Sequence, residues 1–295
     1  FLRVNHHCIT TLALFYAKSQ LSFRYSGTMP KISEKSLIRL KNARHPLLNK
    51  DTCVPISISI GEDFDCLVIT GPNTGGKTVS LKTAGLFALM AQAGLQLPVG
   101  NDSEIGIFED IFADIGDEQS IEQSLSTFSS HMVNIVSILE NLRPRTLVLF
   151  DELCAGTDPV EGAALAVSIL ESVRAKGALC AATTHYAELK IYALDTEGVC
   201  NASCEFDIST LRPTYKLVIG APGKSNAFAI SGRLGLPDDI IHRAETYVSG
   251  ESKRFENAIE RLEQNRVEME TRNAEAEALL AVVMRKQADA AGVGA

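Results

Sequence analysis

The segment GPNTGGKT at residues 71–78 has the residue types and the spacing of a phosphate-binding loop. Gly71, Gly76, Lys77 and Thr78 fit the pattern G-x-x-x-x-G-K-[ST]. In such a loop the glycines let backbone N–H groups surround phosphate oxygens, the lysine neutralises the β- and γ-phosphates, and the hydroxyl serves Mg²⁺. We therefore expect a nucleoside triphosphate site whose cofactor-binding residues include Gly71, Pro72, Asn73, Thr74, Gly75, Gly76, Lys77 and Thr78.

The elements on either side of this loop decide between a binding site and a chance glycine turn. Residues 66–70 are apolar and rich in strand-forming types, and a helical pattern runs from Val79 to about Met90. A strand, a glycine loop and a helix, in that order, are the context that the motif requires. The flanking pattern favours the nucleotide site over the turn.

Two acidic residues downstream supply the chemistry that a phosphate loop lacks. The apolar run 147–150 predicts a buried parallel strand, and it ends in Asp151 and Glu152. Ligands of open α/β sheets bind at the carboxyl ends of the strands. At that edge Asp151 can hold Mg²⁺, and Glu152 can act as the general base for the attacking water. Without the phosphate loop, the two acids would indicate only a strand that ends in a turn.

Three further segments hold candidate residues for the same site. Ser126 and Thr127 stand at the start of a helical pattern, so one of them caps the helix or the helix start receives the γ-phosphate of a second subunit's ATP. Asp158 lies in a turn just after the two acids, where a loop facing a partner would sit. His185 follows the apolar strand 179–183 and is a candidate γ-phosphate sensor, although a lone histidine is more often structural.

The chain as a whole indicates an α/β domain with helical segments at both ends. Residues 1–27 predict the end of a helix, residues 28–235 alternate strand and helix patterns, and residues 236–295 are helical and highly charged. A weak heptad seam in the last segment indicates a coiled coil or, equally, a single solvated helix. Strands are predicted at 55–60, 66–70, 146–150, 179–183 and 215–219.

Composition excludes a membrane protein and argues against a metal-binding or disulfide-rich one. No apolar run approaches the roughly 18 residues that cross a bilayer, so we expect a cytoplasmic protein without a membrane partner. The 7 cysteines are scattered and odd in number, which predicts free thiols and no zinc site. The formal net charge of −8 predicts weak nucleic-acid binding by this piece itself. Because the chain begins with Phe1, we expect it to be a fragment.

Five motifs in order, GPNTGGKT, LVLFDE, SLSTFSSHM, AGTDP and TTHY, resemble the ATPase domain of the MutS family, within the ABC-type P-loop ATPases. Longer stretches at 114–132, 149–166, 183–193 and 201–236 resemble its second bacterial class, the endonuclease-type MutS-two proteins. Residues 43–48 also match the family's segment near the nucleotide. Cys154 departs from the pattern, since a glycine is expected there and a cysteine does not freely adopt positive φ.

The resemblance implies an ATP-hydrolysing homodimer. Lys77 and the backbone of 74–78 would hold the phosphates, and Thr78 and Asp151 would hold Mg²⁺. Glu152 and His185 would be catalytic, as the base and the γ-phosphate sensor. Ser126 and Asp158 would act on the nucleotide across the dimer interface. Residues 224–234 and 237–248 resemble the family's helix-turn-helix dimerisation element.

The resemblance also implies a parent protein larger than this sequence. Such a parent would act on branched or recombining DNA, where it suppresses recombination, or on stalled ribosomes. It would also cut nucleic acid through an Smr-type nuclease domain that this sequence does not contain. An alternative function is a dimeric scaffold that binds ATP and scarcely hydrolyses it, which the presence of Glu152 disfavours. Another alternative is a different ABC-type repair ATPase, whose glycine-rich signature helix has no counterpart in SLSTFSSHM.

Overall fold

The structure is a computed structural model that describes residues 1–72, 75–116, 127–207, 210–224 and 226–248 continuously. Beyond them it describes only residues 250, 258–259, 261, 265, 269, 272–273 and 276. The chain divides into two compact units, Phe1–Gly223 and Lys224–Ala295. Within the described part, none of the helices combines the length and the apolar character that a bilayer crossing needs.

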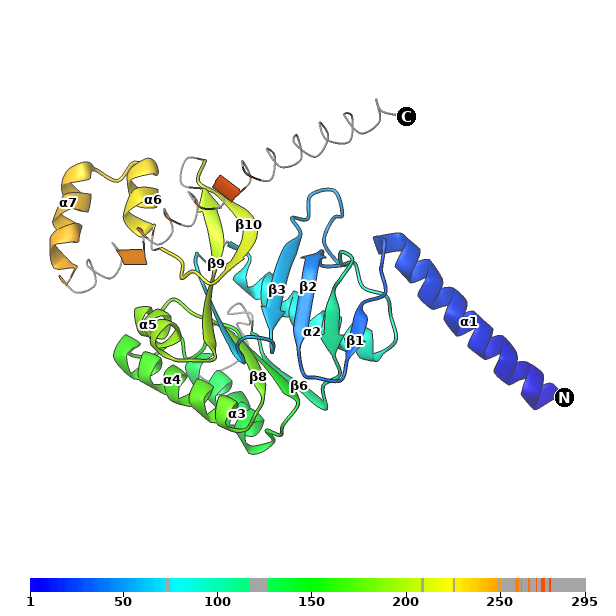
Figure 1. Cartoon of the computed structure of the whole chain (residues 1–295). Coiled ribbons are helices and arrows are strands. Elements are labelled where there is room, and N and C mark those ends of the chain that lie inside the picture. The colour runs from blue at the N-terminus through cyan, green and yellow to red at the C-terminus, as the bar shows by residue number, and fades with distance from the viewer. Residues whose placement is uncertain are drawn as a thin grey trace, which may run out of the picture. The chain divides into compact units, whose positions relative to one another are not determined.

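A six-stranded sheet organises the first unit (Figure 1). Five neighbouring strands run parallel, and β10 pairs antiparallel with β9 at one edge. The three central strands are buried along their whole length, as the apolar runs predict. In spatial order the strands are β10 (Arg212–Ile219), β9 (Val199–Asp207), β4 (Cys66–Thr70), β8 (Leu179–Thr183), β7 (Thr146–Phe150) and β6 (Asp110–Asp114).

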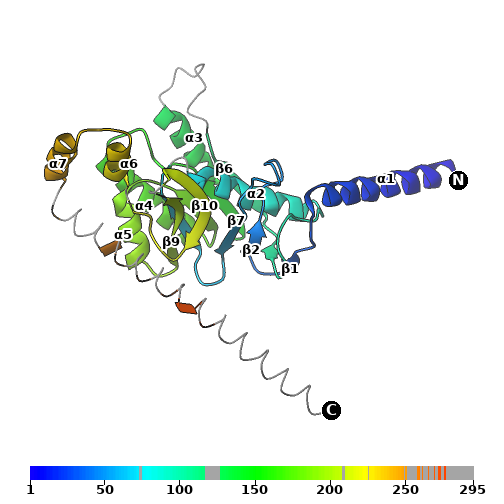
Figure 2. The same cartoon turned by 90° about the horizontal axis from the view of Figure 1, so that it is seen from above.

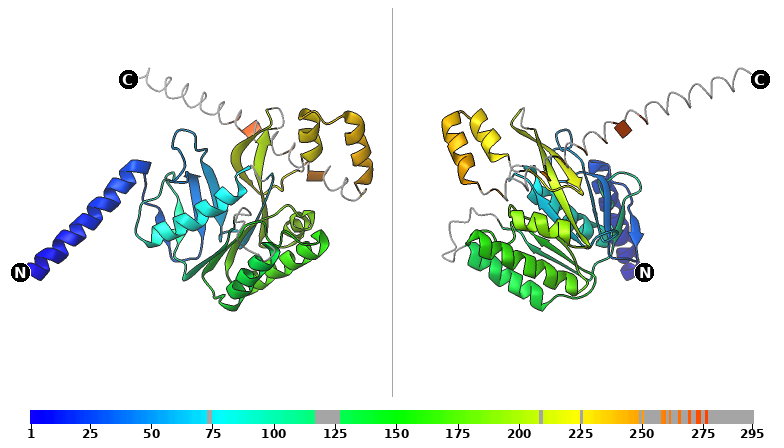
Figure 3. Two further views of the ribbon diagram at one scale, coloured as in Figure 1. Left: turned by 180° about the vertical axis from the view of Figure 1, so that it is seen from behind. Right: turned by 60° about the vertical axis from the view of Figure 1, so that its left-hand side comes forward.

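The two faces of this sheet pack against different helices. Alternate residues of the central strands point to opposite sides, so that Leu67 and Ile69 join one core while Cys66 and Val68 join the other. The first core contains α2 (Lys77–Gln92). The second contains three helices, which Figure 3 shows grouped in green away from the cyan α2. These are α3 (Thr127–Glu140), α4 (Pro159–Ala175) and α5 (Ala187–Asp195).

A second, four-stranded sheet completes the first core. Its order is β1 (Lys31–Ser33), β5 (Glu104–Gly106), β2 (Ile38–Ala43) and β3 (Ile56–Ile60). In β3 the isoleucines are buried and the intervening serines are not, as expected of a strand with one face toward the core. The N-terminal helix α1 (Leu2–Tyr25) is largely exposed, and its Lys18 Nζ donates 2.6 Å to the carbonyl of Ala93, just after α2.

The second unit begins with two short helices, α6 (Ala227–Arg233) and α7 (Asp238–Tyr247), which lie side by side (Figures 1 and 2). Gly235 stands between them with φ 97°, a value that favours glycine at the turn. Two short helices joined by a turn thus lie within the predicted ranges, and their role as a helix-turn-helix dimerisation element stays a prediction. The predicted heptad seam falls mostly outside the described residues and stays a prediction.

The order of strands brings the predicted functional segments to one edge. Because β4, β7 and β8 are parallel neighbours, their carboxyl ends face the same side of the sheet. The phosphate loop follows β4, Asp151 and Glu152 follow β7, and His185 follows β8. Segments more than 100 residues apart in the sequence are thus neighbours in space.

Candidate functional site

The phosphate loop joins β4 to α2 and is shaped by left-handed glycines. Gly71 has φ 124° and Gly76 has φ 95°, values that other residues rarely adopt. Thr70 fixes the end of the strand because its hydroxyl donates to Ala202 O at 3.1 Å and accepts the N–H of Gly223 at 2.7 Å. Asn73 and Thr74, both predicted phosphate contacts, lie outside the described residues.

Cys204 of strand β9 packs closely against the phosphate loop. A methyl group placed on Gly75 would lie 3.0 Å from Cys204 Cβ, and one placed on Gly71 would lie 3.1 Å from the Cys204 carbonyl. Cys204 is buried, and burial raises the pKa of its thiol to about 11 although the positive charge of Lys77 opposes the change. The phosphate loop therefore packs against the small, neutral side chain of Cys204, which the sequence alone did not single out.

Lys77 is the cation of the site, and it is almost wholly buried, with 1% of its surface exposed. Burial lowers the pKa of its ammonium group, while the nearby carboxylates of Glu152 and Asp151 act in the opposite direction. Its Nζ lies 3.5 Å from His185 Nδ1. The structure thus brings together two predicted site residues from segments that follow different strands. A buried cation at this position suits a phosphate anion, because the anion would replace solvation that burial removes.

Thr78 and Asp151 meet directly. The Thr78 hydroxyl donates 2.7 Å to Asp151 Oδ2, and the Thr183 hydroxyl donates 2.6 Å to Asp151 Oδ1. Asp151 is buried. A carboxylate and a hydroxyl are oxygen donors of the kind that Mg²⁺ prefers, and Mg²⁺ usually binds through one or two protein oxygens plus water and phosphate. These two residues therefore fit Mg²⁺.

Glu152 and His185 face each other across the same edge. Their closest atoms, Glu152 Oε2 and His185 Nε2, are 3.9 Å apart. The Glu152 backbone has φ 50°, and its N–H donates 2.7 Å to the Thr183 hydroxyl. Neither side chain is fully buried, so both remain accessible to a ligand and to water. The predicted base and the predicted sensor are therefore neighbours at the edge that carries the phosphate loop.

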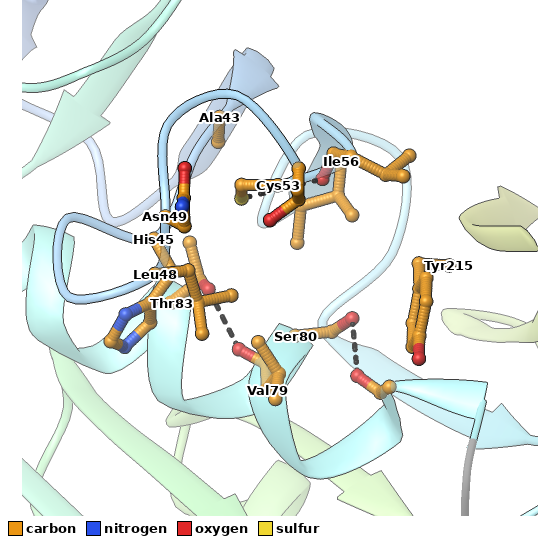
Figure 4. A pocket seen from close by; sticks show the side chains of 13 residues that line it. Ala43, His45, Leu48, Asn49, Cys53, Ile56, Val79, Ser80, Thr83 and Tyr215 are labelled. Carbon is orange, nitrogen blue, oxygen red and sulfur yellow. Dashed lines mark hydrogen bonds between the residues drawn. The ribbon is translucent and has the colours of Figure 1, made fainter.

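A pocket of about 390 Å³ opens beside the start of α2. Figure 4 shows Tyr215 on one side of it and His45 on the other. Tyr215 belongs to β10, lies at a break in the pairing with β9 and has φ 61°. Burial, followed by the charge of Lys82, lowers the pKa of His45. The lining residues are Ala43, His45, Leu48, Asn49, Thr52, Cys53, Val54, Ile56, Gly76, Val79, Ser80, Thr83 and Tyr215.

Comparison with known families agrees with this geometry. The family model described as MutS domain V matches residues 67–250, which include the phosphate loop, the acidic pair and His185. The chain belongs to the MutS family. The expectation of a mixed α/β domain with a parallel sheet is confirmed, and so is the predicted family.

Individual relatives place the resemblance within the second MutS class. The chain is 59% identical over 269 residues to the protein named Endonuclease MutS2 of Ruminiclostridium cellulolyticum, a match that covers 91% of this chain and 34% of the relative. It is 55% identical over 288 residues to Endonuclease MutS2 of Clostridium perfringens strain SM101, covering 98% of this chain and 36% of the relative. The corresponding protein of Clostridioides difficile is 55% identical over 275 residues, 93% of this chain and 35% of the relative. The chain spans about a third of the length of these curated relatives.

The two residues expected to act across a MutS-family dimer have different outcomes. Ser126 lies outside the described residues, which begin again at α3. Asp158 caps α4, because its side chain accepts the N–H groups of Val160 and Glu161 at 3.0 and 3.1 Å. Capping alone accounts for an aspartate at this position, so a role toward a partner stays a prediction.

Cys154, which departs from the MutS-family pattern, has φ 60°. The expected conflict between a cysteine and a left-handed backbone is thus present in the structure. Its side chain is buried beside Asp114, and burial raises the pKa of the thiol to about 11. All 7 cysteines are free, as predicted, and the described residues contain no group of three or more histidines, cysteines or acids that could hold a metal ion.

Besides Cys204, sequence patterns did not single out Thr183, Tyr186 and Tyr215, which also shape this MutS-family site. Thr183 bridges Asp151 and the backbone of Glu152, and the available signal was a hydroxyl at the end of a buried strand. Tyr215 was placed only as part of a strand. Its role in a pocket depends on a bulge that brings β10 beside the start of α2, which short-range patterns do not reveal.

Proposed function

We propose that this MutS-family chain binds ATP with Mg²⁺ and hydrolyses it, as an ABC-type ATPase that works as a homodimer. The hydrogen-bond path from Thr78 through Asp151 and Thr183 to Glu152 is the observation that carries the proposal. It joins the start of the phosphate-loop helix to two strand ends with 2.6–2.7 Å contacts. Such a connected arrangement serves phosphoryl transfer, in which positioning and charge stabilisation account for most of the catalysis.

Binding of the triphosphate would rest on Lys77 and the loop backbone. The N-terminus of α2 carries partial positive charge, and Lys77 adds a full charge that is already desolvated. Mg²⁺ bound through Thr78 and Asp151 would neutralise charge on the β- and γ-phosphates. The buried Asp151 retains lone pairs for this purpose beyond those that accept the two hydroxyl groups.

Hydrolysis would use Glu152 and His185. The oxygen of a water molecule attacks the γ-phosphorus, the bond between that phosphorus and the β,γ-bridging oxygen breaks, and ADP leaves. Glu152 accepts the proton that the water loses. His185 lies near both Glu152 and Lys77 and can donate to a γ-phosphate oxygen. The phosphates and the water would thus be held by residues from three neighbouring strand ends.

The nucleobase would enter the pocket between Tyr215 and His45. Its volume of about 390 Å³ exceeds that of a purine, and aromatic or apolar side chains line most of it. Gly76, the last glycine of the phosphate loop, belongs to both the loop and the pocket lining. A nucleotide can therefore place its phosphates on the loop and its base in the pocket at the same time.

The activity that ATP hydrolysis would drive involves parts of a longer parent protein. Relatives that carry this segment are named as endonucleases of the second MutS class, and the segment makes up about a third of their length. We propose rearrangement of a dimer that acts on branched DNA or on stalled ribosomes, with α6 and α7 in the dimer contact. Cleavage of nucleic acid would belong to a part of the parent outside this chain.

A nucleotide-gated scaffold that does not hydrolyse ATP is the alternative, and release of inorganic phosphate by this chain separates the two functions. We expect steady, Mg²⁺-dependent turnover that Lys77→Ala abolishes together with nucleotide binding, because the buried site loses its cation. Lys176→Ala, at the C-terminal end of α4, serves as the charge-matched control. Tight ATP binding without turnover would favour the scaffold.

A mixing experiment tests the homodimer and the action of Ser126 across it. Ser126→Ala and Lys77→Ala subunits are combined, so that a heterodimer has one site with an intact loop and an intact opposing serine. We expect the mixture to hydrolyse ATP faster than either variant alone. A mixture no faster than the separate variants at any protein concentration would leave Ser126 as a helix cap.

A further inference from the structure

The turn that follows Asp151 has an unusual backbone. Glu152 has φ 50°, Cys154 has φ 60° and Gly156 has φ 88°, so every second residue is left-handed. Only one of the three is glycine. Left-handed residues with a side chain persist when the surrounding structure holds them in place. The contacts that hold this turn therefore also decide where the Glu152 carboxylate points.

The start of the turn is fixed by strand β8. The Glu152 N–H donates to the Thr183 hydroxyl at 2.7 Å, and the Leu153 N–H donates to the Thr183 carbonyl at 3.1 Å. Both bonds precede Cys154, the second left-handed residue. Within the turn the Ala155 N–H donates 2.9 Å to the Glu152 carbonyl, but neither bond to Thr183 reaches Cys154.

The end of the turn is fixed by Tyr186. Its hydroxyl donates 2.8 Å to the carbonyl oxygen of Cys154. Tyr186 directly follows His185, whose imidazole lies 3.9 Å from the Glu152 carboxylate. The candidate sensor and the group that fixes the turn are therefore consecutive residues on one short segment.

Helix α4 makes room for this contact through Gly162. A methyl group on Gly162 would lie 2.4 Å from the Tyr186 hydroxyl oxygen and 2.9 Å from the Cys154 carbonyl oxygen. Glycine within a helix is otherwise unfavourable, since it leaves the backbone of the unfolded chain more freedom to lose. Gly162 is thus an independent sign that the tyrosine hydroxyl and the carbonyl must meet here.

We propose that Tyr186 is a positioning residue for hydrolysis: its hydroxyl, seated over Gly162, locks the turn 152–156 and so directs the Glu152 carboxylate at the attacking water. The inference rests on the proposed ATPase function. The Tyr186 hydroxyl donates to the Cys154 carbonyl, whereas Lys77, Thr78 and Asp151 hold the nucleotide and Mg²⁺ in that function. Loss of the hydroxyl should therefore slow turnover while nucleotide binding is kept.

The test compares Tyr186→Phe with Tyr192→Phe in the full chain. Tyr192 is on α5, and its hydroxyl accepts a 3.5 Å bond from Arg174, so the control removes a hydroxyl outside the turn. We expect Tyr186→Phe to lower kcat roughly three- to tenfold, as one lost hydrogen bond in the transition state would. KM and the Kd for ATP should change less than twofold, and the control should match the parent.

Gly162→Ala disrupts the same contact, between the Tyr186 hydroxyl and the Cys154 carbonyl, by adding a methyl group on α4. The methyl group displaces the hydroxyl, so kcat should again fall while the Kd for ATP is kept. Without the hydroxyl, the methyl group that Gly162→Ala adds has less to clash with. In the Tyr186→Phe background, Gly162→Ala should therefore lower kcat by a smaller factor than it does in the parent. Thermal unfolding of each variant checks that the chain is folded. If Gly162→Ala unfolds, the kcat of Tyr186→Phe, which lacks only one oxygen atom, decides the test.

The outcomes are distinct. A parent-like kcat for Tyr186→Phe overturns the inference and leaves the ATPase intact. A parallel loss of ATP affinity and kcat also overturns it, because the tyrosine would then support the fold of the whole site. Multiplicative effects in the double variant would mean that Gly162 and Tyr186 act separately, which contradicts the shared contact. Absence of phosphate release by the parent itself refutes the proposed function, and the inference falls with it.

Discussion

The hydroxyl of Thr78 donates a 2.7 Å hydrogen bond to the carboxylate of Asp151, across two elements separated by 73 positions in the sequence. Thr78 is the second residue of α2, the helix that follows the phosphate loop, and Asp151 directly follows strand β7. Since β8 lies between β4 and β7 in the sheet, the contact spans a strand, and Thr183 of that strand completes the link. The geometry thus brings together two oxygen groups that fit Mg²⁺ from segments far apart in the sequence.

Loss of the Tyr215 ring should weaken binding of ATP without affecting binding of inorganic tripolyphosphate. Stacking of a base on an aromatic side chain contributes about 1–3 kcal/mol, so Tyr215→Ala should raise the Kd for ATP about fivefold or more. Tripolyphosphate has no base and should bind the parent and the variant equally. Calorimetric titration measures both ligands.

Tyr215→Phe is the matched control for the pocket, because it keeps the ring and removes only the hydroxyl. It should bind ATP as the parent does. If Tyr215→Ala weakens tripolyphosphate and ATP by the same factor, the ring supports the phosphate loop through Gly76, and the pocket beside α2 is not where the base binds.

Substitutions of Asp158 separate helix capping from a role toward a partner subunit. Asp158→Ala removes the acceptor for two N–H groups of α4 and should lower the free energy of unfolding by about 1 kcal/mol. Asp158→Asn keeps a good capping side chain and removes the charge. Urea denaturation and phosphate release are measured on both variants.

Asp158→Asn distinguishes helix capping from a role of the Asp158 carboxylate toward a partner subunit. Parent-like stability together with parent-like turnover would assign Asp158 to capping alone. Parent-like stability with a large loss of turnover would mean that the carboxylate charge acts on the nucleotide, as expected of a residue that reaches across a dimer.

Stability should fall as pH rises above about 9. Burial raises the pKa of the Cys154 and Cys204 thiols to about 11 from an ordinary value of 9.0, so between these values the unfolded chain releases protons that the folded chain keeps. By linkage, the unfolded state then binds fewer protons and the free energy of unfolding declines with pH. The contribution is complete below pH 9 and is lost as pH approaches about 11. Urea denaturation at pH 8, 9 and 10 measures the slope.

Serine variants test the origin of this slope. Cys154→Ser and Cys204→Ser remove one ionisable group each, and each should make the decline between pH 9 and 10 shallower than in the parent. Cys8→Ser, at an exposed position, should leave the slope unchanged. An equal slope in all four proteins would assign the alkaline decline to other groups.

Local patterns were sufficient for the central strands and for the residues that follow them. The runs at 66–70, 146–150 and 179–183 coincide with β4, β7 and β8, because a strand buried on both faces must be apolar at every position. Lys77, Asp151 and His185 could be placed at one edge, since parallel strands expose their carboxyl ends together. The strands predicted at 55–60 and 215–219 overlap β3 and β10.

Other features depend on contacts between distant segments. Strands β1 and β5 have only 3 residues each, too few for a period to emerge, and β6 carries an acid at both ends. Tyr186 and Gly162 meet only because α4 and α5 pack on the same face of the sheet. Tyr215 reaches the pocket beside α2 through a pairing irregularity in β10. None of these contacts leaves a signature within a short window of sequence.

Glu152→Gln, measured for nucleotide binding and for turnover side by side, is the most direct test of the proposed ATPase. Glutamine keeps the size of the side chain and the backbone bond to Thr183 but cannot accept the proton from water. We expect a Kd for ATP within about twofold of the parent and a kcat lower by roughly 10²–10⁴-fold, the usual loss on removal of a general base. Phosphate release at the parent rate by Glu152→Gln would mean that the base is another group, and the proposed mechanism would be wrong.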